Sequence, residues 1–275
     1  MLLKFFLGAG FMLMLFFAFF LEQPRQRSLL GNGDRDRPRL RLMSWNIGYS
    51  DLESETRARA EDLPAVAQTI LSNDPDAIAL QELTGEDQLK LLLAHLKNRY
   101  RGYACSFGSA DRVAAVLVRD RNALFEDVPA GERFAAAATF HLQKDLPEIV
   151  VVSAHADAFN SSRRRSLAED VVDWARGRAG NHSVFVAGDF NFEVSIKNKT
   201  NLFSDNAKHD SEAYNYLLKY FRDLGRAAGE TAISNRRIDY IFGPLDGPAL
   251  RRAEVLREIT IGRMDHWPLM VEIAF

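Results

Sequence analysis

Short apolar runs alternate with segments of helical periodicity along most of the chain. Alternating or continuous apolar positions predict strands at 39–46, 76–83, 113–120, 148–155, 184–193, 237–242 and 267–275. Apolar residues at helical spacing predict helices at 60–72, 86–98, 161–177 and 213–224. The helix at 161–177 is expected to have Ser161 or Ser162 as its N-cap. Strands of both kinds with helices between them favour sheets covered by helices.

The amino-terminal residues differ in kind from the rest. Residues 5–21 form an uncharged run, FFLGAGFMLMLFFAFFL, which reaches roughly 26 Å as a helix and so approaches the thickness of a bilayer core. It predicts a transmembrane anchor at 1–21, and the alternative is a cleaved signal sequence, although the run ends without small residues for cleavage. We therefore expect a single-pass membrane protein. The side of the membrane stays open, because Lys4 precedes the run and several arginines follow it.

The remaining chain predicts a tethered globular domain. Residues 22–39 are rich in Arg, Gly, Asp and Pro without periodicity, which predicts a flexible linker, and 40–275 show no further break in composition. The 275 residues are 47% hydrophobic with a net charge of −2, a balance that argues against a dedicated, tight nucleic-acid binder. The single cysteine, Cys105, excludes an intramolecular disulfide and a multi-cysteine zinc site.

Polar side chains fall at the ends of several predicted strands. They are Asn46, Glu82, His155, Asp189, Asn191, Asp239 and the pair Asp265 and His266. Each one alone is more typical of a loop or of an ordinary surface group. Asp239 differs, because it lies inside an apolar run, where a carboxylate needs a hydrogen bond or a cation. A histidine is its natural partner, since a carboxylate fixes the tautomer of the ring and raises its basicity.

Together these residue types supply what the hydrolysis of a phosphate ester requires. Oxygen ligands from Glu and Asp suit a hard divalent ion such as Mg²⁺, for which Mn²⁺ can substitute. Amide side chains can donate to phosphoryl oxygens without adding negative charge. A buried Asp can take a proton from water, and an Asp-braced His can stay cationic against the charge that develops on the phosphate.

Six short motifs occur in a fixed order between residues 40 and 275: SWN, LQE, SAH, GDFN, RIDYIF and DHWP. In this order they resemble the motif series of the endonuclease/exonuclease/phosphatase superfamily, which includes deoxyribonuclease-like nucleases, neutral sphingomyelinases and inositol-polyphosphate phosphatases. The resemblance implies an α+β fold, a four-layer α/β/β/α sandwich of two facing mixed sheets flanked by helices, with the site at one edge. One such motif alone would be weak, and six in order make the resemblance specific.

The resemblance also implies roles in metal binding and in the activation of water. Glu82 would be the principal Mg²⁺ ligand, supported by Asn46 and by Asp265. Asp189 would orient or deprotonate the attacking water, and Asn191 would hold the phosphate.

The two histidines would act on the phosphate itself. His266, braced by Asp239, would bind and polarise the phosphoryl oxygens, and His155 would contact the phosphate or help the leaving group. The chain departs from the family pattern at Met264, where a small Ser is usual, and at 111–115, where a glycine-rich approach is replaced. These departures bear on substrate geometry more than on the core chemistry.

The run Arg163-Arg164-Arg165 is the candidate for substrate binding. It lies in the first turn of the helix predicted at 161–177, where cations oppose the helix dipole. A solvated basic turn is the ordinary explanation, and contact with an anionic substrate is the functional one. The substrate is a nucleic-acid phosphodiester, a lipid headgroup or a soluble phosphate ester, and an inactive anchored binding domain remains an alternative. The sequence indicates no protein partner.

Overall fold

The computed structural model describes residues 37–49, 56–105, 112–130, 133–180, 182–194 and 205–275. The predicted anchor at 1–21 lies outside the described residues, as does the predicted linker except for its last three positions. None of the helices in these ranges is long and apolar enough to span a bilayer. Residues Pro38–Phe275 form one compact unit.

Six strands form the first sheet. Their spatial order is β11 (Ala249–Val255), β12 (Leu269–Ala274), β1 (Arg39–Asn46), β2 (Ala77–Leu83), β4 (Val113–Val118) and β3 (Arg101–Ala104). The two central strands, β1 and β2, run parallel, and β12 and β4 pair antiparallel on either side of them. The carboxyl ends of β1 and β2 therefore lie together at one edge of this sheet.

The second sheet also has six strands. Their order is β5 (Leu124–Ala130), β6 (Arg133–Phe140), β7 (Glu148–His155), β8 (His182–Asp189), β10 (Asp239–Pro244) and β9 (Phe221–Asp223). Here β7 and β8 are the parallel pair, and their last residues, His155 and Asp189, are directly opposite each other. Asp239, the first residue of the antiparallel strand β10, pairs with Asp189 from the other side.

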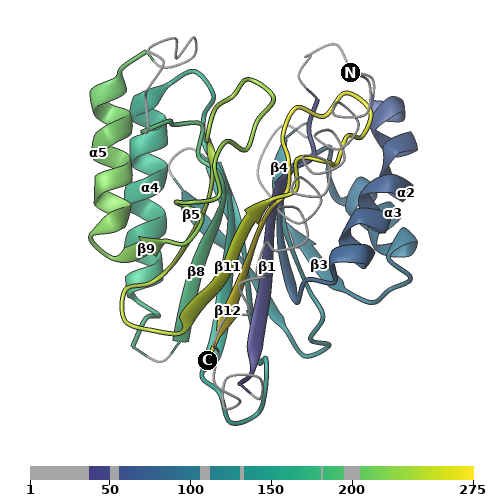
Figure 1. Cartoon of the computed structure of the whole chain (residues 1–275), viewed down its shortest axis with the longest axis horizontal. Helices are drawn as coiled ribbons and strands as arrows, with labels where there is room; N and C mark the ends of the chain where they lie inside the picture. The colour runs from purple at the N-terminus through teal and green to yellow at the C-terminus, as the bar shows by residue number, and fades with distance from the viewer. Residues whose placement is uncertain (1–36, 50–55, 106–111, 131–132, 181, 195–204) are drawn as a thin grey trace, which may run out of the picture. The chain divides into compact units, whose positions relative to one another are not determined.

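Two helices cover the outer face of each sheet (Figure 1). They are α2 (Thr56–Asn73) and α3 (Glu86–His95) on the first sheet, and α4 (Ser161–Arg176) and α5 (Ala207–Leu218) on the second. The inner faces of the two sheets pack on each other through strands such as β2 and β7. The prediction of two facing mixed sheets flanked by helices is thus confirmed.

The core divides in the same way. One buried apolar cluster fills the space between the sheets and under α2 and α3, and a second lies between the other sheet and α4 and α5. Strand β6 contributes alanines to both clusters. Ala136 and Ala138 belong to the first cluster, and Ala135 and Ala137 belong to the second. An aromatic group that includes Phe190, Tyr240 and Phe242 packs on the helical side.

Several details differ from the sequence predictions. The helix predicted at 213–224 is α5, which begins at Ala207 and ends at Leu218, and strand β9 occupies the end of the predicted helix. The N-cap of α4 is Asn160, whose side chain accepts from the Arg163 N–H, and neither predicted serine caps the helix. Five strands were not predicted: β3, β5, β6, β9 and β11. β3, β5, β9 and β11 are short or partly exposed, and β6 is a buried run of alanines, so none of them shows a clear apolar alternation.

Candidate active site

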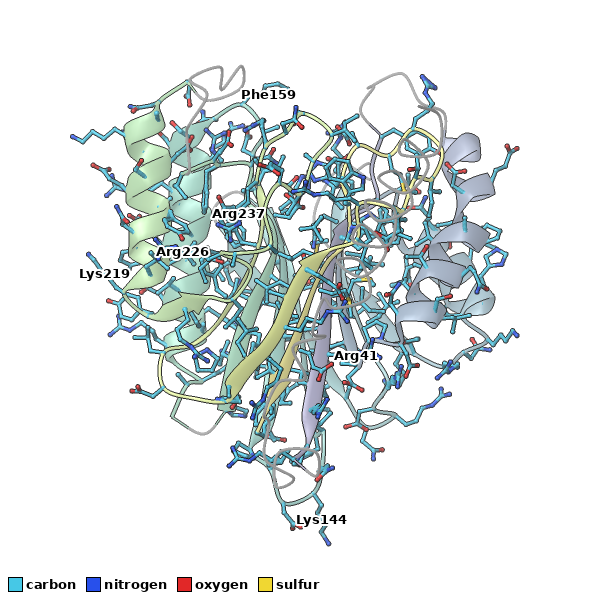
Figure 2. The ribbon with its side chains drawn as sticks, in the orientation of Figure 1. Arg41, Lys144, Phe159, Lys219, Arg226 and Arg237 are labelled. Carbon is cyan, nitrogen blue, oxygen red and sulfur yellow. The ribbon has the colours of Figure 1, made fainter. Side chains whose placement is uncertain are left out.

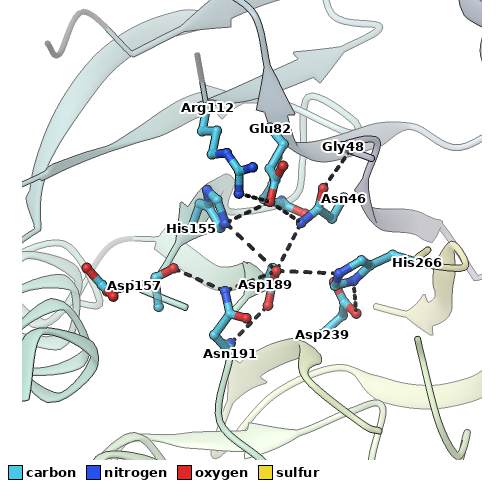
Figure 3. A network of polar contacts seen from close by, with 12 residues as sticks. Asn46, Gly48, Glu82, Arg112, His155, Asp157, Asp189, Asn191, Asp239 and His266 are labelled. Carbon is cyan, nitrogen blue, oxygen red and sulfur yellow. Dashed lines mark hydrogen bonds and ion pairs between the residues drawn. The ribbon is translucent and has the colours of Figure 1, made fainter. Parts of the chain in front are cut away.

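The polar strand ends of both sheets meet at one place (Figure 3). The residues that converge there are Asn46 from β1, Glu82 from β2, His155 from β7, Asp189 and Asn191 from the end of β8, Asp239 from β10, and His266 before β12. All of them are buried. The parallel pairs β1–β2 and β7–β8 explain the convergence, because each pair brings two carboxyl ends to the same edge.

Asp189 is the centre of this network. Its Oδ2 accepts from Asn46 Nδ2 at 3.0 Å and from Asn191 Nδ2 at 3.2 Å, and its Oδ1 accepts from the Asn191 backbone N–H at 2.9 Å. The Nε2 atoms of His155 and His266 each lie 3.8 Å from Oδ2. Burial raises the pKa of Asp189 to about 7, despite the opposing effect of His266. A carboxylate with this pKa can accept a proton from water near neutral pH.

Asp239 and His266 form a buried pair, as predicted from the sequence. His266 Nδ1 lies 2.8 Å from Asp239 Oδ2, and Asp239 is fully buried. The Thr231 hydroxyl accepts from the Asp239 backbone N–H and fixes the start of β10. Burial lowers the pKa of His266, but the carboxylates of Asp239 and Asp189 outweigh it and raise this pKa to about 10. The ring is therefore cationic at neutral pH.

Glu82 lies beside Asn46 and His155, above Asp189 in the view of Figure 3. Its Oε1 is 3.2 Å from Asn46 Nδ2, 3.3 Å from Arg112 Nη1 and 3.5 Å from His155 Nε2. Burial raises the pKa of Glu82, but His155 and Arg112 outweigh that effect and leave it below its usual value. The backbone φ of Glu82 is 61°, an unusual conformation for a residue with a side chain. His155 and Arg112 therefore favour the carboxylate form of Glu82, and an unusual backbone conformation sets its position.

Asn46 joins the two halves of the site. Its Oδ1 accepts from the Gly48 backbone N–H at 2.8 Å, and its Nδ2 donates to both Glu82 and Asp189. Asn46 therefore positions two carboxylates. Its role as a metal ligand stays a prediction, since an amide oxygen has two lone pairs and can contact a second partner.

A glycine lets the second sheet bring Asp189 to the site. Gly188 has φ of 150°, and a Cβ at this position would lie 1.9 Å from the backbone oxygen of Ala154 on β7. The close approach of β7 and β8 therefore excludes any side chain here, and it places the next residue of each strand, His155 and Asp189, opposite each other.

Asp265 is near the site but does not belong to the groups of residues whose ligand atoms lie closest together. Its Oδ1 is 3.9 Å from His266 Nε2, and its side chain is 30% exposed. Burial raises its pKa, with a further contribution from the charge of Glu82. Among the described residues, the groups whose ligand atoms lie close enough for one ion are Glu82, His155 and Asp189, and Asp189, Asp239 and His266.

The three arginines predicted to bind substrate have other partners. Arg164 is fully buried and its Nε and Nη2 donate to the carboxylate of Asp210 on α5, at 2.7 and 3.1 Å. Arg165 donates to Glu212 of α5 at 2.6 Å as well as to Glu169. The structure thus gives Arg164 and Arg165 a role in joining α4 to α5. The burial of Arg164 contradicts its predicted contact with substrate, and the contact predicted for Arg165 stays a prediction.

Arg163 differs from its two neighbours. Its side chain is 54% exposed, and Nη1 lies 3.4 Å from Asp157, which follows β7 and the site residue His155. It is the member of the run that the structure leaves near the surface beside the site.

Sequence reasoning missed two residues that shape the site. Arg112 was noted only as a departure from a glycine-rich pattern, yet it forms an ion pair with Glu82. Gly48 donates to Asn46, and a Cβ added there would lie 2.1 Å from Glu82 Oε2. The sequence offered a signal for both, because Gly48 follows the SWN motif by two positions and Arg112 directly precedes an apolar strand.

Residues 43–261 match the model of the Endonuclease/Exonuclease/phosphatase family. The chain therefore belongs to this family, and it is an enzyme of the class that hydrolyses phosphate esters. No curated protein matches it by sequence.

Solved structures of similar fold include three with informative names. An endonuclease/exonuclease/phosphatase from Bacteroides vulgatus is 18% identical, with a TM-score of 0.67 over 86% of this chain and 99% of that one. A mannosyl-6-phosphatase from Bacteroides thetaiotaomicron is 20% identical, with a TM-score of 0.65 over 86% and 100%. The catalytic domain of human Nocturnin with a bound sulfate anion is 19% identical, with a TM-score of 0.62 over 86% and 94%.

Proposed function

We propose that this chain is a membrane-anchored, Mg²⁺-dependent phosphodiesterase that directs water in line at phosphorus, without a covalent enzyme intermediate. The observation that carries the proposal is the pair formed by the carboxylate of Asp189 and the imidazole of His266. A buried carboxylate with a pKa near 7 lies 3.8 Å from a histidine whose pKa is near 10. One group can accept a proton at the pH at which the other remains cationic.

The residues present fit a divalent metal ion. Two close groups of ligand atoms share Asp189, and Asp239 Oδ1 is buried without a hydrogen-bond partner in the described part of the chain. Carboxylate oxygens are the ligands that Mg²⁺ prefers. Glu82 would be the principal ligand of the ion, supported by Asn46 and Asp265, which leaves Asp189 to act on the attacking water. When bound, Mg²⁺ would neutralise and polarise the phosphate, and Mn²⁺ would serve in its place.

Side chains of the protein carry out the proton transfers and stabilise the charge on the phosphate. Asp189 accepts the proton of the attacking water, held in place by the donors Asn46 and Asn191. His266, cationic and fixed by Asp239, stabilises the charge that grows on the phosphoryl oxygens. His155, on the Glu82 side, lies where it can donate to a phosphoryl oxygen or to the leaving group.

Two substrate classes are supported by different observations. Family membership favours a nucleic-acid phosphodiester, and the cations Arg112 and Arg163 near the site suit an anionic chain. A phospholipid or sphingolipid headgroup is favoured by the apolar segment at 5–21. It is also favoured by two apolar side chains beside the site, Phe159 and Ile233, which are 62% and 55% exposed.

A screen of substrates with and without metal tests the proposal. The full chain is assayed with Mg²⁺, Mn²⁺ or EDTA on plasmid DNA, RNA, sphingomyelin vesicles, phosphoinositides and a bis-aryl phosphodiester. Asp189→Ala and His266→Ala should abolish turnover. Asp87→Ala and His95→Ala, which remove the same groups from helix α3 away from the site, should not. Turnover that survives EDTA, or that is equal in all four variants, would overturn the proposal.

A further inference from the structure

A cavity is lined by α5 and by the segments next to the end of β8 and the start of β10. It has a volume of about 390 Å³ and is lined by Val194, Ser211, Tyr214, Asn215, Arg226 and Arg237. This volume is within the roughly 300–1,000 Å³ that is typical of small-molecule sites. Figure 2 shows Arg226 and Arg237 on the side of the molecule that carries α5. None of the residues of the candidate active site lines this cavity.

The charge at the cavity is positive. Among the described residues that line it, two are arginines and none is acidic. Asp223 is engaged by two of the lining residues, since it accepts from Arg237 Nη2 at 2.5 and 2.7 Å and from the Tyr214 hydroxyl at 2.8 Å. Glu193, adjacent to Val194 in the chain, pairs with Arg236 at 3.7 Å. Within the described part of the chain, Arg226 thus has no carboxylate partner.

Several side chains that line the cavity have hydrogen-bond donors without a partner among the described residues. Arg226 and Asn215 are exposed, and neither has a hydrogen-bond or ion-pair partner within the described ranges. Arg237 is rigid, because its guanidinium lies 4.3 Å from the ring centroid of Tyr240 and is held by Asp223. Its buried Nε has no hydrogen-bond partner among the described residues. A guanidinium with unused donors binds carboxylate and phosphate oxygens through paired hydrogen bonds.

We propose that this cavity binds the oxyanion group, phosphate or carboxylate, of a small ligand, with Arg226 and Asn215 as the groups that contact it. The ligand would influence the catalytic residues through two short chain segments. Val194 follows Asn191 by three residues, and Arg237 precedes Asp239 by two. The proposal does not depend on the reaction at the active site, because binding is measured without metal or turnover.

The test follows backbone amides of α5 by nuclear magnetic resonance. The full chain in detergent, with EDTA and at constant ionic strength, is titrated with inorganic phosphate, with succinate, or with chloride as the control. We expect saturable shifts of the amides of 211–215 with one or both oxyanions. A response to phosphate alone assigns phosphate-bearing ligands, and a response to succinate alone assigns carboxylates. Phosphate at the catalytic centre is observed separately, through the amides of Asn191 and His266.

Two variants with the same change of charge decide the outcome. Arg226→Gln should weaken oxyanion binding at least tenfold, which corresponds to about 1.4 kcal/mol. Lys219→Gln removes a cation from the C-cap of α5, outside the cavity, and should bind like the wild type. Both side chains are exposed, so neither change threatens folding. No saturable shift with either oxyanion, an equal effect of chloride, or equal binding by Arg226→Gln and wild type would overturn the proposal.

Discussion

The pair of Asp239 and His266 allows a quantitative test of the site. The pKa of His266 rises from 6.5 to about 10 in the folded protein, which corresponds to roughly 5 kcal/mol in favour of the cation at about 1.4 kcal/mol per pH unit. Asp239 makes the largest contribution that raises this pKa, and its Oδ2 lies 2.8 Å from the ring. Asp239→Asn removes this charge and keeps an oxygen that accepts from Nδ1.

We expect Asp239→Asn to lower the pKa of His266 by about 1–3 units, the effect of one close opposite charge. The alkaline limb of the pH profile of kcat should move to lower pH by the same amount, and kcat/KM should fall by roughly 10²–10⁴. Stability gives a second readout. Because the pKa is raised on folding, protonated His266 stabilises the fold fully below pH 6.5, and this contribution is lost as pH rises through about 10. The variant should lose less stability over this range.

The pKa of His266 is measured by titrating its ring resonances in the metal-free protein, and stability by urea denaturation between pH 6 and 10. Asp87→Asn makes the same chemical change at a fully exposed side chain of α3 and should match the wild type. A pKa of His266 at or below 6.5 in the wild type would refute the reasoning. An unchanged pKa in Asp239→Asn would refute it as well.

Three further changes test how the fold positions the site. Gly48→Ala should displace the Glu82 carboxylate, which lies 2.1 Å from the new Cβ, and lower kcat tenfold or more while the fold persists in circular dichroism. Arg164→Met breaks a buried ion pair between α4 and α5 and should lower the free energy of unfolding by about 3–5 kcal/mol in urea, with kcat of the folded enzyme unchanged. Gly188→Ala should cost roughly 3 kcal/mol or more because its Cβ meets a backbone oxygen at 1.9 Å, whereas Gly180→Ala, with open space around it, should cost less than about 1 kcal/mol.

The sequence was informative where strands are buried and central. β2, β7 and β8 contain continuous apolar runs and β1 begins with an alternating one. All four have a polar residue at or next to their last position, and parallel pairing brings such ends together. Burial alone indicated that Asp239 needs a donor, because a carboxylate inside an apolar strand must be hydrogen-bonded or paired with a cation. His266 as that partner, and the grouping of His266, Asp189 and Glu82 in one site, were implied by the resemblance to the family.

Where partial exposure weakens the apolar pattern, the sequence was less informative. β11 is exposed or half-buried throughout, so nothing in its pattern separates it from a loop. Arg164 was missed as a buried residue, because its partner Asp210 lies on another helix and a run of three arginines resembles a solvated turn. The hydrogen bond that fixes the side chain of Asn46 was missed for a similar reason. The N–H that holds its oxygen belongs to the backbone of Gly48, which no pattern of side chains shows.

Glu82 reaches the site through a backbone conformation that a strand pattern does not contain. In a regular strand, adjacent side chains point to opposite faces, and Gln81 already points between the sheets, where its Nε2 donates to Ser153 of β7 at 3.0 Å. A regular β2 would therefore direct Glu82 away from the second sheet. The φ of 61° at Glu82 reverses this at a cost on the order of 1–3 kcal/mol. It allows Gln81 to join the two sheets while the next residue contacts Asn46, and Gly48 leaves the space that the carboxylate needs. The strain thus lies at the residue on which the proposed metal site depends.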